Sequence, residues 1–67
     1  MDVFLNHRQY SFEKEINLTS FLTEIKIGSV VGIAIAINEM VIPKSEWDNT
    51  IINDNDKIIL IKATAGG

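Results

Sequence analysis

Residues 32–47, GIAIAINEMVIPKSEW, contain the clearest strand pattern in the chain. Isoleucine alternates with alanine from Ile33 to Ile37, so the isoleucines share one face of an extended segment and the alanines share the other. β-Branched residues also favour the pleated conformation. We therefore predict a central strand over residues 32–38, with Ile35 buried in the core.

The second half of this stretch predicts a short strand at the edge of a sheet. Met40–Ile42 is apolar, and Pro43 ends the strand because proline has no N–H to donate to a neighbouring strand. We expect Trp47 to hold the following loop against the sheet edge. The remainder of residues 39–53 is polar and is expected to be irregular.

A short amphipathic helix is predicted upstream of residue 32. Asn17 is the expected N-cap, because its side-chain oxygen can accept a hydrogen bond from the first turn. Gly28 suits the left-handed position that follows a helix ending near Ile27. The apolar residues have the i, i+3, i+4, i+7 spacing of a buried helix face: Leu18, Phe21, Leu22 and Ile25.

The N-terminal residues predict a β-hairpin. Asn6 and His7 belong to types that tolerate the positive φ angles of a tight turn, which would join a strand over residues 1–5 to a strand over residues 9–13. His7 is the only histidine, and we interpret it as a turn residue. Alternation in the first strand places three apolar residues on the core side: Met1, Val3 and Leu5.

The C-terminal half ends in a turn and a last strand. Residues 53–56, NDND, have the composition of a turn, and Lys57–Lys62 is the last predicted strand. Asp54 and Asp56 are spaced like the start of a calcium loop, but the required glycine and distal glutamate are absent. We therefore interpret both as turn formers.

These elements predict an α+β protein of the β-grasp type. One helix across one face of a mixed, four- to five-stranded sheet buries the helix stripe and the alternating strand residues together. Residues 1–63 would form this domain. Residues 64–67 would form a flexible C-terminal tail that ends in two glycines.

The same fold predicts an exposed apolar patch, because a β-grasp sheet places its first and last strands side by side. Alternation assigns Ile58 and Leu60 to the core and leaves Phe4, Ile59 and Ile61 on the opposite face. Contiguous exposed apolar residues mark interaction surfaces. We predict that these three residues bind a partner.

Composition narrows the functional classes. The 67 residues carry a net charge of -3 and are 46% hydrophobic, which suits one small domain. The core of such a domain supplies only about 3–5 kcal/mol of net stability, so a deep catalytic cleft is not expected. The absence of cysteine excludes disulfides, thiolate metal sites and a cysteine nucleophile. The acidic balance argues against nucleic acid as a partner.

The sequence predicts neither a membrane span nor a leader. The longest uncharged apolar run, residues 27–37, is shorter than the ~20 residues that a membrane helix needs. The N-terminus has no basic segment before an apolar stretch, so we expect no signal peptide. We expect a cytoplasmic protein without a membrane partner.

Three features together resemble the ThiS family, the ubiquitin-like sulfur carriers of thiamine biosynthesis. A strand starts at Met1, and the chain ends in Ala65-Gly66-Gly67. Residues 34–47 combine a small-residue strand, an asparagine, a short strand, a proline–basic pair and a tryptophan at the family's spacing. The resemblance covers the whole chain. Residues 34–47 are its most specific part, because all ubiquitin-like carriers share the diglycine.

The resemblance implies a chemical role for Gly67. Its carboxylate would be adenylated by a partner enzyme, converted to a thiocarboxylate and used to donate sulfur to thiazole synthase. Ala65 and Gly66 would complete the reactive tail, since a glycine without Cβ can thread a narrow enzyme channel.

The resemblance also implies the partners of the chain. They are a ThiF-type adenylating enzyme, thiazole synthase and a sulfur donor such as a cysteine desulfurase. ATP and magnesium would be used by the adenylating enzyme. This chain itself would bind no cofactor or metal and would supply no catalytic residue.

Three other functions fit parts of the pattern. A sulfur carrier for molybdopterin synthesis would share the fold and the tail, although residues 37–47 and the short chain favour thiamine. A ubiquitin-like protein modifier would form a stable isopeptide through Gly67. A plain binding module with an accidental diglycine would tolerate deletion of Gly67.

Overall fold

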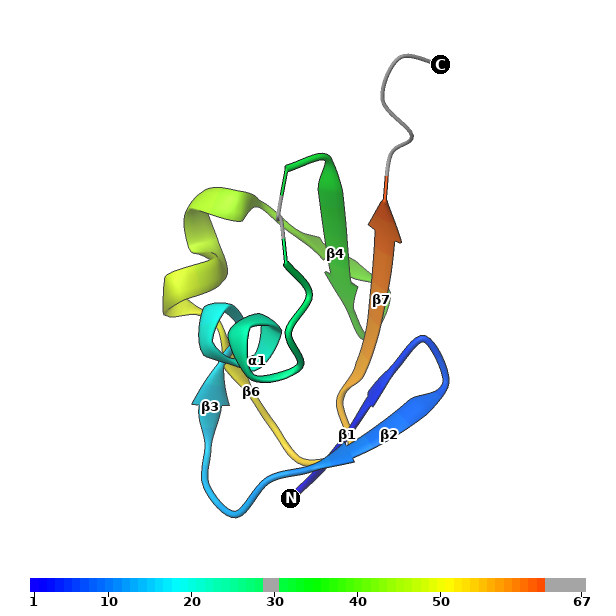
Figure 1. Cartoon of the computed structure of the whole chain (residues 1–67), viewed down its shortest axis with the longest axis vertical. Coiled ribbons are helices and arrows are strands. Elements are labelled where there is room, and N and C mark those ends of the chain that lie inside the picture. The colour runs from blue at the N-terminus through cyan, green and yellow to red at the C-terminus, as the bar shows by residue number, and fades with distance from the viewer. Residues whose placement is uncertain (29–30, 63–67) are drawn as a thin grey trace.

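The computed structural model describes residues 1–28 and 31–62, in which one α-helix lies against one face of a mixed five-stranded sheet (Figure 1). The strands of this sheet are β1 (Asp2–Leu5), β2 (Arg8–Ser11), β4 (Ile33–Ile37), β5 (Met40–Ile42) and β7 (Lys57–Lys62). Their order is β2-β1-β7-β4-β5, with β1 and β7 parallel and the other neighbours antiparallel. This is the predicted β-grasp arrangement. The predicted tail lies outside the described residues.

Both hairpins of the sheet turn on an asparagine and the residue after it. Asn6 and His7 have φ angles of 47° and 72°, and Asn38 and Glu39 have 50° and 71°. Positive φ at both turn positions matches the twist of the flanking strands. The predicted N-terminal hairpin is confirmed. Its second strand ends at Ser11 rather than at residue 13, because the chain bends away at residues 13–14.

Helix α1 (Leu18–Glu24) starts where the sequence predicted. The N–H of Ser20 donates to Oδ1 of Asn17 at 2.7 Å, so Asn17 is the N-cap. The helix buries the predicted stripe: Leu18, Phe21 and Leu22, with Ile25 half-buried beside them. Within the described part of the chain, no helix is long and apolar enough to cross a membrane.

The helix ends earlier than predicted. Its last residue is Glu24, and Lys26 adopts the left-handed conformation with a φ of 56°. The N–H of Ile27 donates to the carbonyl of Leu22 at 3.3 Å, as in a Schellman motif. The predicted end near Ile27 is wrong because Lys26 already takes the role expected of Gly28. The glycine also has a positive φ, but it lies beyond the helix end.

Two short features replace the irregular region predicted within residues 39–53. A 3₁₀ helix, η1, covers Lys44–Asn49, and a two-stranded antiparallel sheet joins β3 (Ile16–Asn17) to β6 (Ile51–Ile52). Two turns of 3₁₀ helix or a pair of strand residues are too short to show a hydrophobic period. The expectation of irregular structure is therefore corrected.

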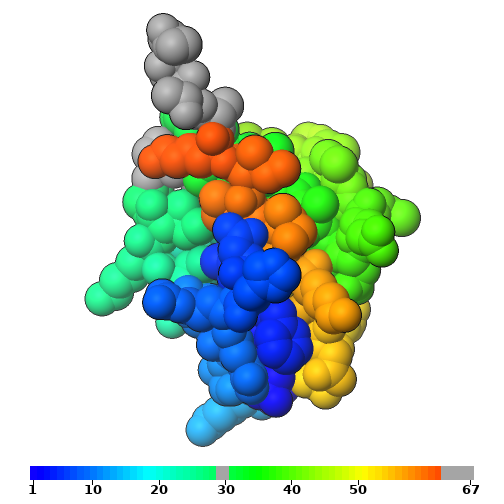
Figure 2. Space-filling view, turned by 90° about the vertical axis from the view of Figure 1, so that its right-hand side faces the viewer, coloured from blue at the N-terminus to red at the C-terminus, as the bar shows by residue number. Residues whose placement is uncertain are grey.

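The core lies between α1 and the sheet. Nine apolar side chains of the described residues form it: Val3, Leu18, Phe21, Leu22, Ile35, Ile37, Trp47, Ile52 and Ile58. Ile35 is buried and both alanines of β4 point to the opposite face, as predicted. That opposite face is seen in Figure 2, where β7 (orange) runs between the N-terminal hairpin (blue) and the β4–β5 hairpin (green).

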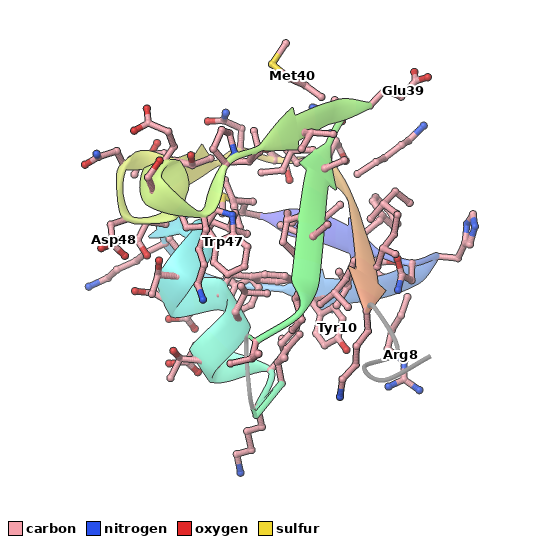
Figure 3. The ribbon with its side chains drawn as sticks, turned by 90° about the horizontal axis from the view of Figure 1, so that it is seen from above. Arg8, Tyr10, Glu39, Met40, Trp47 and Asp48 are labelled. Carbon is pink, nitrogen blue, oxygen red and sulfur yellow. The ribbon has the colours of Figure 1, made fainter. Side chains whose placement is uncertain are left out.

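Trp47 anchors η1 to the edge of the sheet. Its indole N–H donates to the carbonyl of Ile42 in edge strand β5 at 2.9 Å, and its ring is buried. Figure 3 shows the side chain pointing from η1 back toward the sheet. The predicted role of Trp47 is confirmed.

Candidate functional site

The sheet face that points away from α1, here called the outer face, carries the predicted docking residues. Ile58 is 1% exposed and faces the core, whereas Ile59 and Ile61 on the same strand are 40% and 61% exposed. Phe4 is half-buried on β1, and its neighbour Val3 is buried. The predicted alternation is confirmed in both strands.

Strand pairing brings these apolar residues together. Phe4 lies opposite Lys57 across the parallel β1–β7 pair, and it lines one depression together with Ile59. Ile61 lies two residues further along the same face of β7. On the other side, Ala36 pairs with Ile59 and Ala34 pairs with Ile61. We call the set Phe4, Ile59, Ile61, Ala34 and Ala36 the outer-face patch; its docking role stays a prediction.

The outer-face patch continues to the edge of the sheet. Val41 of β5 pairs with Ala36 and is 70% exposed. Because alanine side chains are short, Ala34 and Ala36 form a shallow apolar strip on β4, between the longer side chains of β7 and Val41 of β5. An apolar surface that extends across neighbouring strands is typical of a protein interaction site.

Asn6 fixes the position of β7 beneath the outer-face patch. Its side-chain amide donates to the carbonyl of Leu60 at 3.2 Å, and its Oδ1 accepts the N–H of Leu60 at 3.0 Å. Its own N–H donates to the carbonyl of Ile58 at 3.0 Å. One side chain thus extends the β1–β7 pairing by imitating a backbone strand. Sequence reasoning assigned Asn6 only to the turn, because hydrophobic periodicity carries no signal for such a bridge.

The acidic turn before β7 has a structural role. The carboxylate of Asp56 is buried, and it accepts hydrogen bonds from the side-chain amide of Asn38 at 2.9 Å and the N–H of Asn53 at 2.8 Å. Asp54 accepts the N–H of Asp2 at 2.7 Å. Both aspartates are therefore turn formers, as predicted. Within residues 1–28 and 31–62, no three histidine, aspartate or glutamate side chains gather as metal ligands would.

The three predicted tail residues, Ala65, Gly66 and Gly67, lie outside the described residues. Strand β7 ends at Lys62, which pairs with Ile33. Ile59 and Ile61 of the outer-face patch therefore lie on the strand that precedes residues 63–67 in the sequence. A protein that covers Ile61 lies close to the start of the tail.

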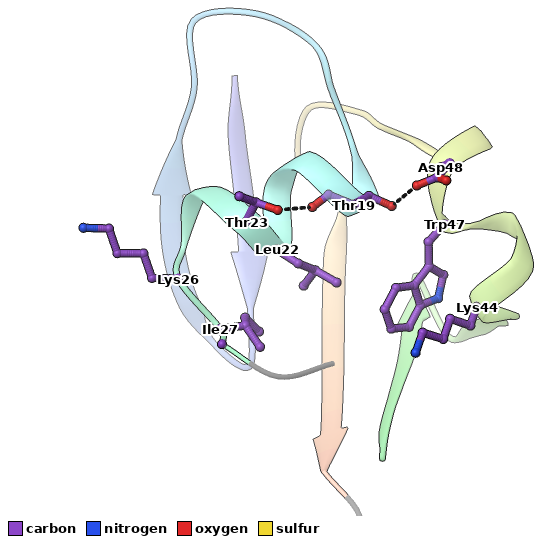
Figure 4. Close-up of a pocket in the computed structure, with 9 residues that line it drawn as sticks. Thr19, Leu22, Thr23, Lys26, Ile27, Lys44, Trp47 and Asp48 are labelled. Atoms are coloured by element: carbon purple, nitrogen blue, oxygen red, sulfur yellow. Dashed lines mark hydrogen bonds between the residues drawn. The ribbon is translucent and has the colours of Figure 1, made fainter. Parts of the chain in front are cut away.

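A second depression lies between α1 and η1 (Figure 4). It has a volume of about 470 Å³, and Lys26 and Lys44 approach it from opposite sides. The hydroxyl of Thr19 donates to the carboxylate of Asp48 at 2.5 Å, which joins the two elements. Because the Thr19–Asp48 hydrogen bond and the buried Trp47 both hold η1 against α1, we assign this region to the packing of η1 on α1.

Comparison with known proteins adds independent information. The model of the ThiS family matches residues 3–67. The sulfur carrier protein ThiS of Escherichia coli (strain K12) is 42% identical over 36 residues, which cover 54% of each chain. The match thus spans about half the length of that curated relative.

Two solved structures share the fold. The crystal structure of thiamine biosynthesis protein ThiS from Geobacter metallireducens has a TM-score of 0.86 at 20% identity, covering 100% of both chains. The solution structure of a thiamine biosynthesis protein from the same organism has a TM-score of 0.78 at 20% identity, covering 100% of this chain and 88% of that one. The ubiquitin-like β-grasp prediction is therefore confirmed.

Proposed function

The chain belongs to the ThiS family, and from this premise we propose that it is a sulfur carrier of thiamine biosynthesis. The observation that carries the proposal is the extent of the family match, which runs from residue 3 to Gly67 and includes the terminal diglycine. The name of the Escherichia coli relative, a sulfur carrier protein, supports the same function. The molybdopterin and protein-modifier alternatives have no comparable support.

The proposed chemistry takes place at the carboxylate of Gly67. A carboxylate is a poor electrophile, so one of its oxygens first attacks the α-phosphorus of ATP, forming an acyl adenylate and releasing pyrophosphate. A hydrosulfide ion supplied by the sulfur donor then attacks the acyl carbon, and AMP leaves. The product is a thiocarboxylate that donates its sulfur to thiazole synthase. ATP and magnesium are bound by the adenylating enzyme, and this chain supplies the group that is modified.

The folded domain serves as the recognition element in this proposal. The ThiF-type adenylating enzyme covers the outer-face patch, where Ile59 and Ile61 are exposed. Five residues follow Lys62, and an extended chain of that length spans at most about 18 Å. The partner's active site must therefore lie within this distance of the end of β7. In this proposal the outer face of β7 contributes to docking, and the chemistry takes place beyond the end of β7, at Gly67.

Reconstitution tests the proposed function. The full chain is incubated with the ThiF-type enzyme, magnesium, ATP and a sulfur source, and its intact mass is measured. We expect the mass change for replacement of one oxygen by sulfur, located at Gly67 by fragmentation. Variants that lack Gly67, or that extend beyond it, should keep the same circular dichroism but remain unmodified, because terminal residues contribute little to a core. A variant without Gly67 that still supports thiazole formation would overturn the proposal.

A further inference from the structure

A small depression on the outer face lies between the β1–β2 turn and β7. Its volume is about 250 Å³, and its lining residues are Phe4, His7, Lys57, Ile58 and Ile59. Sites for small molecules usually occupy roughly 300–1,000 Å³. This depression is smaller, and it lies within the outer-face patch. Its size suits one side chain of a docked protein.

The lining of the depression is amphipathic. Phe4 and Ile59 provide apolar walls, and Lys57, directly opposite Phe4 in the strand pairing, provides a cation. The residues that lie opposite Phe4 and Ile59 in the neighbouring strands are Gln9 and Ala36, and both are uncharged. A positive charge in an apolar setting of an otherwise acidic chain favours a partner group that has both methylenes and a negative charge.

His7, in the β1–β2 turn, forms one side of the depression. Its φ of 72° is in the region that favours glycine, and the second position of this kind of turn prefers glycine. The turn thereby places His7 in the lining of the depression. Glu39 has nearly the same φ, 71°, at the equivalent position of the β4–β5 hairpin, so this angle is a property of the turn.

We propose that this depression receives one carboxylate-bearing side chain of the adenylating partner. The carboxylate pairs with the ammonium of Lys57, the methylenes pack on Phe4 and Ile59, and His7 forms the rim. This inference rests on the proposed function and deepens it, because it makes Lys57 and His7 specificity determinants within the outer-face patch. The backbone N–H of Lys57 donates to Oδ1 of Asn38, and substitution of the side chain preserves this bond.

Charge reversal tests the pairing. We compare the affinity of the full chain for the ThiF-type enzyme by calorimetry for wild type, Lys57→Glu, Lys57→Met and Lys57→Arg. Lys57→Glu should weaken binding at least about tenfold at low salt, whereas Lys57→Arg should bind nearly as wild type. Lys14→Glu is the matched control, because it makes the same change of charge in the exposed loop between β2 and β3. It should leave the affinity nearly unchanged.

The salt dependence and a turn variant complete the test. The affinity of wild type should fall more steeply with salt than that of Lys57→Met, because only wild type forms the ion pair. His7→Gly should melt no lower than wild type and yet bind more weakly. Equal salt slopes for wild type and Lys57→Met would overturn the pairing, as would equal losses from Lys57→Glu and Lys14→Glu. These results concern this inference alone: failure of wild type to form a thiocarboxylate would instead overturn the proposed function.

Discussion

Two adjacent substitutions in β7 separate docking from folding. Ile58 is 1% exposed in the core, so Ile58→Asp places a carboxylate among apolar side chains. Shortening a buried isoleucine costs about 2–5 kcal/mol, and an unpaired buried charge adds several more. The sum exceeds the roughly 3–5 kcal/mol that holds a domain of this size together. We expect Ile58→Asp to be unfolded.

Ile59→Asp has a different effect because Ile59 is 40% exposed on the outer face. Its carboxylate reaches water in the free protein, and the main loss is the lower strand preference of aspartate, about 1 kcal/mol. The domain should stay folded. In the complex the same carboxylate lies against the apolar part of the outer-face patch and beside Lys57, where it displaces the partner's carboxylate from that lysine; we expect a cost of about 3 kcal/mol or more. This corresponds to a loss of roughly 100-fold in affinity for the adenylating enzyme.

Circular dichroism with thermal denaturation measures the first effect, and calorimetric titration with the adenylating enzyme measures the second. Ile59→Asp should show a cooperative transition and weak binding, and Ile58→Asp should show no cooperative transition. The reasoning is refuted if Ile59→Asp binds as tightly as wild type. It is also refuted if the two variants are equally destabilised, because strand alternation would then not separate them.

Two further substitutions test the fold. Ile35→Ala removes a fully buried side chain of β4 and should cost about 2–5 kcal/mol in chemical denaturation, leaving the variant largely unfolded; a wild-type transition would contradict the assignment of Ile35 to the core. Asn17→Ala removes the acceptor for the N–H of Ser20 and should cost about 1 kcal/mol in the free energy of unfolding, and an unchanged midpoint would show that the cap does not contribute.

The parts of the fold that the sequence predicted are those with a repeating pattern or a local chemical cause. Alternation placed Ile35 and Ile58 in the core and Ile59 outside it. The side-chain oxygen of Asn17 marked the start of α1, because capping needs only residues a few positions apart. Asn6 marked the first turn for a similarly local reason.

Features held by contacts between distant segments were missed. Helix α1 ends earlier than predicted because Lys26 adopts a left-handed conformation, which is not expected from its residue type. Strand β3 depends on pairing with β6, in which Ile16 lies opposite Ile52, 36 residues away in the sequence, and two residues are too few to show a period. The bridge from Asn6 to Leu60 spans 54 residues. Such contacts exist only once the sheet has formed.

The candidate site also has a part that the sequence predicted and a part that it did not. The sequence predicted the exposure of Ile59 and Ile61, because both follow from alternation in one strand. It did not predict the depression beside Phe4, which requires the turn at His7 to lie next to β7. Register between strands, rather than the content of any one strand, creates that part of the surface.

The most direct test of the proposed function is the intact mass of the chain purified from its own host cells, with fragmentation of its C-terminal peptide. A sulfur carrier is regenerated in each cycle, so we predict a free chain of which a fraction carries a thiocarboxylate at Gly67. A chain found only as high-mass adducts through an isopeptide at Gly67 would contradict the proposed function and support a protein modifier. A chain with only an ordinary carboxylate, even when thiamine synthesis is induced, would also contradict it.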